Sequence, residues 1–256
     1  MPHQAHVHFE PWPLPLPITL LLGCAALLYT LHWFRLRSAH ANAMPVWRLT
    51  AFLGGLLSIW AAVASPISVL DHQLLTFHMV KHLLLMIVAS PLILLGAPQL
   101  VAARRASSIR QLGWPLFLAS ATVVGWHIPA AFELALESHA WHGVENASFL
   151  VAGLLFWWPV VGVRPEDARS WSIPLYLFLA TLPCDILSAF LAFCGRVVYT
   201  VYLATPHQFS LAPLDDQQFA GALMWVSVTL IYLLPAVVIT VQILSPKGAP
   251  VKGAAT

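Results

Sequence analysis

Long apolar segments separated by short polar ones dominate the pattern of the chain. Each segment is close to the roughly 20 residues that a helix needs to cross the hydrocarbon core of a bilayer. The pattern therefore predicts an all-α, polytopic membrane protein with seven transmembrane helices. The predicted helices lie at residues 14–34, 47–64, 74–96, 112–132, 144–163, 171–194 and 217–244.

Composition points to the same fold class. The chain has 256 residues, of which 59% are apolar and 9% are charged, whereas a soluble domain has about a quarter of its residues charged. We divide the chain into an extracytoplasmic tail that contains histidine, a transmembrane domain and a short cytoplasmic tail. These three parts are residues 1–13, 14–244 and 245–256.

Basic residues indicate the orientation in the membrane, because lysine and arginine accumulate in cytoplasmic loops. Ten of the twelve lie at alternate ends of the predicted helices, which leaves only Lys81 and Arg196. This distribution places the N-terminus outside and the C-terminus in the cytoplasm. Because these residues mark topology and do not form a patch, we expect the lipid bilayer as a partner and no nucleic acid.

Histidines gather on one side of this predicted topology. Ten of the twelve lie on the outer side, among them His3, His6 and His8 in the N-terminal tail. His78 and His82 are four residues apart, so they project from the same face of a helix. Imidazoles that several helices bring to one end of a bundle suit transition metals such as Cu, Zn, Fe and Ni.

The sequence thus predicts a metal site built from three helices at the outer end. Met86 continues the stripe of His78 and His82, and a thioether is a ligand for soft ions such as Cu(I). His127 stands in the motif GWHIP, where Pro129 should loosen the helix. The candidate metal ligands are His78, His82, His127 and His142, with His139, His72 and Met86 as adjuncts.

Two charged residues fall deep inside predicted helices, Lys81 and Asp185. Isolated charges are costly in hydrocarbon, so we expect Lys81 and Asp185 to form an ion pair in the bundle interior. The functional alternative is a proton relay, or a group that repels or releases a cation.

Three sequence elements between residues 65 and 245 carry a family resemblance: HMVKHLLLM, WHIP and FWWP, in this order. With them the chain resembles the CtaG family of cytochrome c oxidase assembly factors, of the seven-span type associated with caa oxidases. It departs from the family pattern at Lys81, where glutamine is common, and at Asn146, where a further histidine is common.

The resemblance implies a role in delivering or inserting copper during maturation of a haem-copper cytochrome c oxidase. His78, His82, His127 and His142 match the outer-side histidines that are the family's expected copper ligands. The implied partners are haem-copper oxidase subunits and extracytoplasmic copper carriers. The implied location is the bacterial cytoplasmic (inner) membrane, which the chain would cross several times.

The same residues bear on four other functions: an enzyme, a haem-binding cytochrome, a transporter and a structural polar network. No Ser-His-Asp order, P-loop or HExxH motif occurs, so no catalytic residues are predicted and an enzyme is not expected. A haem-binding membrane cytochrome would use histidines on facing helices as axial ligands. A metal or proton-coupled transporter would need polar groups that continue inward, but beyond Asp185 the inner halves are mainly apolar. A purely structural polar network is the remaining alternative.

Overall fold

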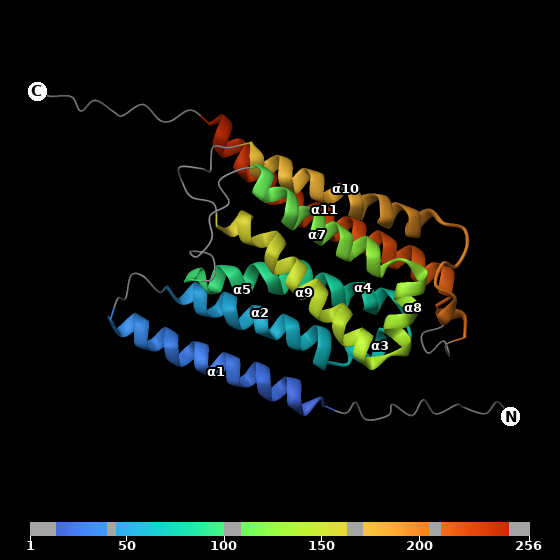
Figure 1. The fold of residues 1–256 in the computed structure, drawn as a ribbon, viewed down its shortest axis with the longest axis horizontal. Coiled ribbons are helices and arrows are strands. Elements are labelled where there is room, and N and C mark those ends of the chain that lie inside the picture. Colours follow the sequence, from blue (N-terminus) through green and yellow to red (C-terminus); the bar gives the residue numbers. More distant parts are fainter. Residues whose placement is uncertain (1–13, 40–44, 100–108, 163–170, 205–210, 246–256) are drawn as a thin grey trace, which may run out of the picture.

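The computed structural model describes residues 14–39, 45–99, 109–162, 171–204 and 211–245 (Figure 1). All regular structure within these residues is helical, which confirms the all-α fold class. The elements are α1 (Leu16–Ala39), α2 (Val46–Ala64), α3 (Ile67–Leu70), α4 (Leu75–Leu83), the π-helical η1 (Leu84–Ala89), α5 (Ser90–Gly96), α7 (Ile109–Trp126), α8 (Pro129–Glu137), α9 (His139–Val161), α10 (Ser172–Phe193), the 3-10 helical η2 (Thr200–Leu203) and α11 (Pro213–Leu244).

Six of the described helical stretches are long and apolar enough to cross a membrane, and a bent helix pair makes a seventh if it counts as one span. This agrees with the predicted number of transmembrane helices. Helix length and composition do not determine which end faces the cytoplasm, so the predicted orientation stays a prediction. Of the two predicted tails, 1–13 and 245–256, the first with its histidines and residues 246–256 of the second lie outside the described residues.

The bent pair is the predicted fourth helix, residues 112–132, which is not continuous. Helix α7 ends at Trp126, and α8 begins at Pro129 at an angle of 74° to it. Proline has no N–H to donate and disfavours helical geometry in the residue before it, and Ile128 is accordingly extended. His127 therefore sits at the break, where its backbone oxygen accepts a hydrogen bond of 3.0 Å from the Tyr199 hydroxyl.

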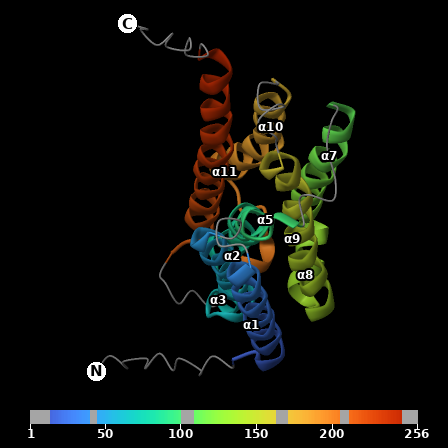
Figure 2. The same ribbon diagram turned by 90° about the vertical axis from the view of Figure 1, so that its left-hand side faces the viewer.

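The span formed by α4, η1 and α5 is the centre of the bundle. About three fifths of its most apolar window (61%) is buried, compared with 11% for α1 at the edge. Figure 2 shows α5 in the middle of the helices, with α2, α9 and α11 around it. Side chains on this span are therefore surrounded by other helices, and α1 packs mainly against α2.

The start of α4 is capped by a side chain from another helix. Asp216 in the first turn of α11 accepts hydrogen bonds from the backbone N–H groups of Leu75, at 2.6 Å, and Thr76, at 3.2 Å. The Thr76 hydroxyl donates a third bond to the same carboxylate, at 2.6 Å. A carboxylate at a helix N-terminus satisfies free N–H groups and complements the helix dipole. This contact fixes α4 against α11 two turns before His82.

The π-helical turn of η1 is held by side chains that bind its carbonyl groups. Ser90 Oγ donates to the oxygen of Leu85 at 2.8 Å, and Trp157 Nε1 donates to the oxygen of Met86 at 3.1 Å. A Cβ at Gly153 of α9 would lie only 2.8 Å from that same Met86 oxygen. Glycine at 153 thus permits α9 to approach the central span closely, next to the candidate metal ligands.

Candidate metal centre

Four histidines and three charged residues meet at the end of the bundle where α3 and α8 lie, which we call the histidine end (Figure 1). Helix α4 supplies His78, Lys81 and His82, and the loop before it supplies Asp71 and His72. Helix α9 supplies His142 and Glu145. These side chains form two clusters with Lys81 between them.

The inner cluster consists of His78, His82 and Glu145. The two Nε2 atoms lie 2.7 Å apart, and each is 3.3 Å from Glu145 Oε1. The three residues are 1%, 5% and 0% exposed. The spacing of four residues places both imidazoles on one face of α4, as predicted, and α9 brings the carboxylate to them.

This inner cluster has more acceptors than donors. Both carboxylate oxygens of Glu145 and the Nδ1 atoms of His78 and His82 have no hydrogen-bond partner among the described residues. Two neutral imidazoles that face each other through Nε2 share at most one proton. The three ligand atoms lie within 4.8 Å of one another, so one cation can contact all of them. Two imidazoles and a carboxylate are a set that borderline metals accept.

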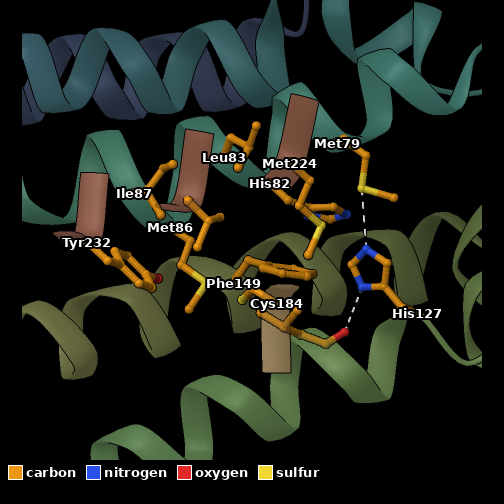
Figure 3. A pocket seen from close by; sticks show the side chains of 12 residues that line it. Met79, His82, Leu83, Met86, Ile87, His127, Phe149, Cys184, Met224 and Tyr232 are labelled. Atoms are coloured by element: carbon orange, nitrogen blue, oxygen red, sulfur yellow. Dashed lines mark hydrogen bonds between the residues drawn. The ribbon is translucent and has the colours of Figure 1, made fainter. Parts of the chain in front are cut away.

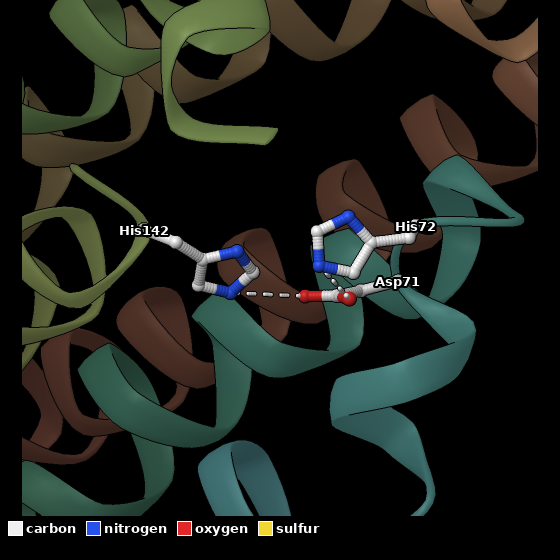
Figure 4. A group of neighbouring side chains, drawn as sticks. All are labelled: Asp71, His72 and His142. Carbon is white, nitrogen blue, oxygen red and sulfur yellow. Dashed lines mark ion pairs between the residues drawn. The ribbon is translucent and has the colours of Figure 1, made fainter. Parts of the chain in front are cut away.

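The outer cluster consists of Asp71, His72 and His142 (Figure 4). His142 Nε2 lies 3.3 Å from Asp71 Oδ2, and His72 Nε2 lies 3.7 Å from Asp71 Oδ1. The His72 side chain is 40% exposed, whereas Asp71 is completely buried. The cluster is therefore the more accessible of the two, and it lies between the surface and the inner cluster.

Lys81 joins the two clusters, and the predicted pair of Lys81 with Asp185 is wrong. Its ammonium lies 2.5 Å from Asp71 Oδ2, 2.8 Å from His142 Nε2 and 3.7 Å from Glu145 Oε2. Asp185 instead accepts a hydrogen bond of 3.1 Å from the Thr229 hydroxyl. Depth counted along the sequence does not show which way a helix face points, and the Lys81 face of α4 turns to α9.

Burial and neighbouring charges shift the pKa values of Asp71 and His72, the two residues of the outer cluster that lie outside the membrane-spanning helices. Burial alone would raise the pKa of Asp71, but the hydrogen bond from His142 and the charge of Lys81 outweigh it and hold this pKa well below its usual range. Burial lowers the pKa of His72, although the Asp71 carboxylate opposes the shift. The outer cluster thus holds an ionised carboxylate beside a neutral imidazole at neutral pH.

His127 does not join the inner cluster. Its Nδ1 lies 2.6 Å from the backbone oxygen of Val123, and its Nε2 lies 3.3 Å from Met79 Sδ. Its ring centre is 6.4 Å from that of His82. The structure therefore places His127 next to the inner cluster, with a methionine as its immediate neighbour.

A cavity of about 30 Å³ separates His82 from His127 and continues toward η1 (Figure 3). This is room for one or two atoms of the size of a water molecule. Met86, predicted as an adjunct ligand, lines this cavity and is not part of the inner cluster. Sulfur atoms line it from three directions, on Met79, Met86, Met224 and Cys184.

The clusters contain residues that were not predicted as ligands, and the predicted ligand His139 lies outside both of them. His139 is exposed and belongs to neither cluster. Glu145 and Asp71 were not among the predicted ligands, although Glu145 follows His142 by three residues and so shares its helix face. Met79 is not among the predicted ligands either, because spacing along α4 does not show that His127 would approach it.

The chain is therefore a helical membrane protein with two clusters of imidazole and carboxylate groups at one end of its bundle. Residues 27–245 match the family model described as cytochrome c oxidase caa3 assembly factor, and the chain belongs to this family. No solved structure matches it.

The curated relatives are uncharacterized proteins of mycobacteria. One from Mycobacterium leprae is 24% identical over 262 residues, which cover 88% of this chain and 38% of the relative. One from Mycobacterium bovis is also 24% identical, over 80% of this chain and 36% of its own length. The chain thus spans less than two fifths of the length of these relatives.

Proposed function

We propose that the protein binds copper at the inner cluster and supplies it during assembly of a caa3-type cytochrome c oxidase, in a role that is not catalytic. The convergence of His78, His82 and Glu145 carries this proposal, because three buried ligand atoms meet there without enough donors to satisfy them. Family membership adds the process, since oxidase assembly is what the family is named for.

The two clusters suggest a direction for the copper. The partly exposed outer cluster, with Asp71 and His72, receives the ion from an extracytoplasmic carrier. The ion then passes to the inner cluster. In this path the histidine end faces outside, as the basic residues predict, and the protein crosses the bacterial cytoplasmic membrane several times. Oxidase subunits with an empty copper site are the partners that accept the ion.

The ammonium of Lys81 occupies the space between the two clusters while no copper ion is bound. It lies 2.5 Å from Asp71 and 3.7 Å from Glu145, between the two carboxylates that a cation would approach. The side chain compensates both negative charges while no ion is bound, since unpaired buried charges are costly. Its four-carbon stem allows the ammonium to withdraw toward Asp71 when copper reaches Glu145.

The geometry does not favour haem. Axial ligands lie on opposite sides of an iron, whereas the Nε2 atoms of His78 and His82 lie 2.7 Å apart on one helix. Pockets for organic ligands and cofactors have volumes on the order of several hundred Å³, whereas the cavity beside His82 has a volume of about 30 Å³.

A transporter is also disfavoured, because aromatic rings fill the bundle beyond the cavity. Phe156 stacks on both Tyr176 and Tyr232, with ring centres 5.0 and 4.9 Å apart. Trp157 packs edge-on against Tyr232 at 5.6 Å. These buried rings offer no series of ligands toward the opposite end.

Cells that depend on the caa3 oxidase test this function. We expect the double change of His78 and His82 to alanine to leave the amount of membrane-inserted protein near normal and to lower both oxidase activity and the copper content of the oxidase. His32→Ala is the matched control, because His32 is exposed on α1. Normal oxidase activity and copper content with the double variant would refute the proposal.

A further inference from the structure

The cavity beside His82 is lined by an unusual share of the sulfur in this protein. Met79, Met86 and Met224, three of the chain's five methionines, face it together with Cys184. They come from three parts of the chain, α4 with the adjoining η1, α10 and α11, which meet around this space (Figure 3). Thioether and thiol groups are ligands for soft metal ions.

His127 Nε2 and Met79 Sδ face each other without a proton that could form a hydrogen bond between them. A backbone carbonyl only accepts, so the 2.6 Å contact between His127 Nδ1 and the Val123 oxygen places the imidazole proton on Nδ1. The lone pair of Nε2 then faces Met79 Sδ at 3.3 Å, and sulfur in a thioether carries no proton either. A second proton on His127 would add a charge to an enclosed, mostly apolar space.

A metal ion between Nε2 and Sδ would accept both lone pairs and so replace the missing proton. Bonds of about 2.0 Å to an imidazole nitrogen and about 2.3 Å to sulfur are usual for zinc, and together they exceed the 3.3 Å between Nε2 and Sδ. One ion therefore contacts both atoms without moving them apart. Met86, Met224 and Cys184 line the same space and complete the surroundings of the ion.

The charge of the ion follows from the residues around it. None of the residues that line the cavity is a carboxylate, so a divalent ion would remain uncompensated in an apolar enclosure. Among the carboxylates outside this lining, Asp71 and Glu145 are partly offset by Lys81. Asp185, which follows Cys184 in the sequence, is half-buried and accepts a hydrogen bond from Thr229. A soft, monovalent ion fits both the sulfur atoms and a lining without carboxylates, and Cu(I) is such an ion.

His82 connects the cavity with the inner cluster. Its Nε2 lies 2.7 Å from His78 Nε2, its ring lines the cavity, and its Nδ1 is buried without a partner among the described residues. An imidazole that borders both positions can pass an ion between them by turning its ring.

We propose that Met79 and His127, with Met86, Met224 and Cys184, form a second copper position that is selective for Cu(I). This inference rests on the proposed function, since it makes the cavity the holding site for copper that the inner cluster has received. The protein then carries two copper positions of different chemistry: imidazole and carboxylate at His78, and imidazole and sulfur at Met79.

The direct test is X-ray absorption at the selenium edge of the full chain, purified with selenomethionine in place of methionine and loaded anaerobically with Cu(I). We expect copper neighbours around selenium, and two equivalents of Cu(I) per chain. Met79→Leu should remove one equivalent, or weaken its binding about 10-fold or more, while the fold is retained because leucine conserves the volume. Ile87→Leu is the matched control, because it changes the packing of the same cavity without removing a donor.

Two further samples separate this inference from the proposed function. The double variant His78→Ala with Glu145→Gln destroys the inner cluster and leaves every cavity-lining residue in place, so it should keep the selenium–copper signal. Loading with Zn(II) should give no selenium–zinc signal. Copper bound without selenium neighbours and unaffected by Met79→Leu overturns the inference and leaves the proposed function standing. Equal selenium–metal signals for zinc and copper overturn the Cu(I) selectivity, and no copper in any sample overturns both proposals.

Discussion

Lys81 and Asp71 form an ion pair inside the bundle, with Nζ 2.5 Å from Oδ2 and both side chains completely buried. They are ten residues apart, and the pair ties the middle of α4 to the loop that precedes it. It also ties α4 to α9, because the same ammonium reaches His142 and Glu145. The histidines of the inner cluster are therefore held in place by charges that flank them.

Breaking this pair from one side should be more harmful than removing it entirely. We expect Asp71→Asn to lower the free energy of unfolding by about 3–5 kcal/mol, because it strands a buried charge. Lys81→Met should cost at least as much, since it strands both Asp71 and Glu145. The double change should be better tolerated than the sum of the two. Unfolding in mixed micelles measures these free energies, and strictly additive losses would contradict the pairing.

The ion pair should persist on mild acidification. The pKa of Asp71 is held well below its usual range, so the stability that its charge contributes is fully present above the unfolded pKa of about 3.9 and is lost only as the pH falls below it. We expect the difference in unfolding free energy between wild type and Asp71→Asn to stay constant from roughly pH 7 to pH 5. A difference that shrinks within that range would show that Asp71 takes up a proton earlier.

His142 and His139 should differ in their effect on copper uptake. His142 contacts Asp71 at 3.3 Å in the outer cluster, whereas His139, one turn earlier on α9, is exposed. We expect His142→Ala to slow the loading of copper into the purified protein and His139→Ala to load like wild type. Stopped-flow loading with a Cu(I) chelate as donor compares the two variants. Equal loading rates for both variants would show that copper does not pass through the outer cluster.

A methyl group at Gly153 should disturb the site from a distance. The added Cβ would lie 2.8 Å from the Met86 oxygen, so α9 must shift away from η1 and carry Glu145 with it. We expect Gly153→Ala to lower the thermal stability and to weaken copper binding. Gly143→Ala on the same helix is the control, because a Cβ there meets nothing within 4 Å. Similar behaviour of the two variants would argue against this coupling.

The transmembrane helices could be predicted because bilayer thickness fixes the length of an apolar span. The break between α7 and α8 in the fourth predicted helix could not be predicted, although Pro129 was expected to loosen this helix. A proline can kink a helix or end it, and here the contact of Tyr199 with His127 favours the break. The 74° turn that results is a tertiary feature.

Within the site, the sequence predicts which side chains of one helix lie side by side, but it does not predict which side chains of different helices meet. His78 and His82 meet because four residues complete about one turn. The approach of Glu145 depends on how closely α9 packs at Gly153, and the partner of Lys81 depends on the rotation of α4. The contact between Met79 and His127 likewise depends on α7. Such rotations are set by packing against several neighbours, which spacing along one chain does not encode.

The copper content of the purified protein decides whether the inner cluster binds copper. Wild type and the double variant with alanine at positions 78 and 82 would be purified in parallel, loaded with copper, freed of excess and analysed for metal per chain. We expect stoichiometric copper in the wild type and loss of the copper held by the inner cluster in the double variant, with the helix content of both unchanged. Full copper content in the double variant, or no copper in the folded wild type, would refute copper binding at the inner cluster.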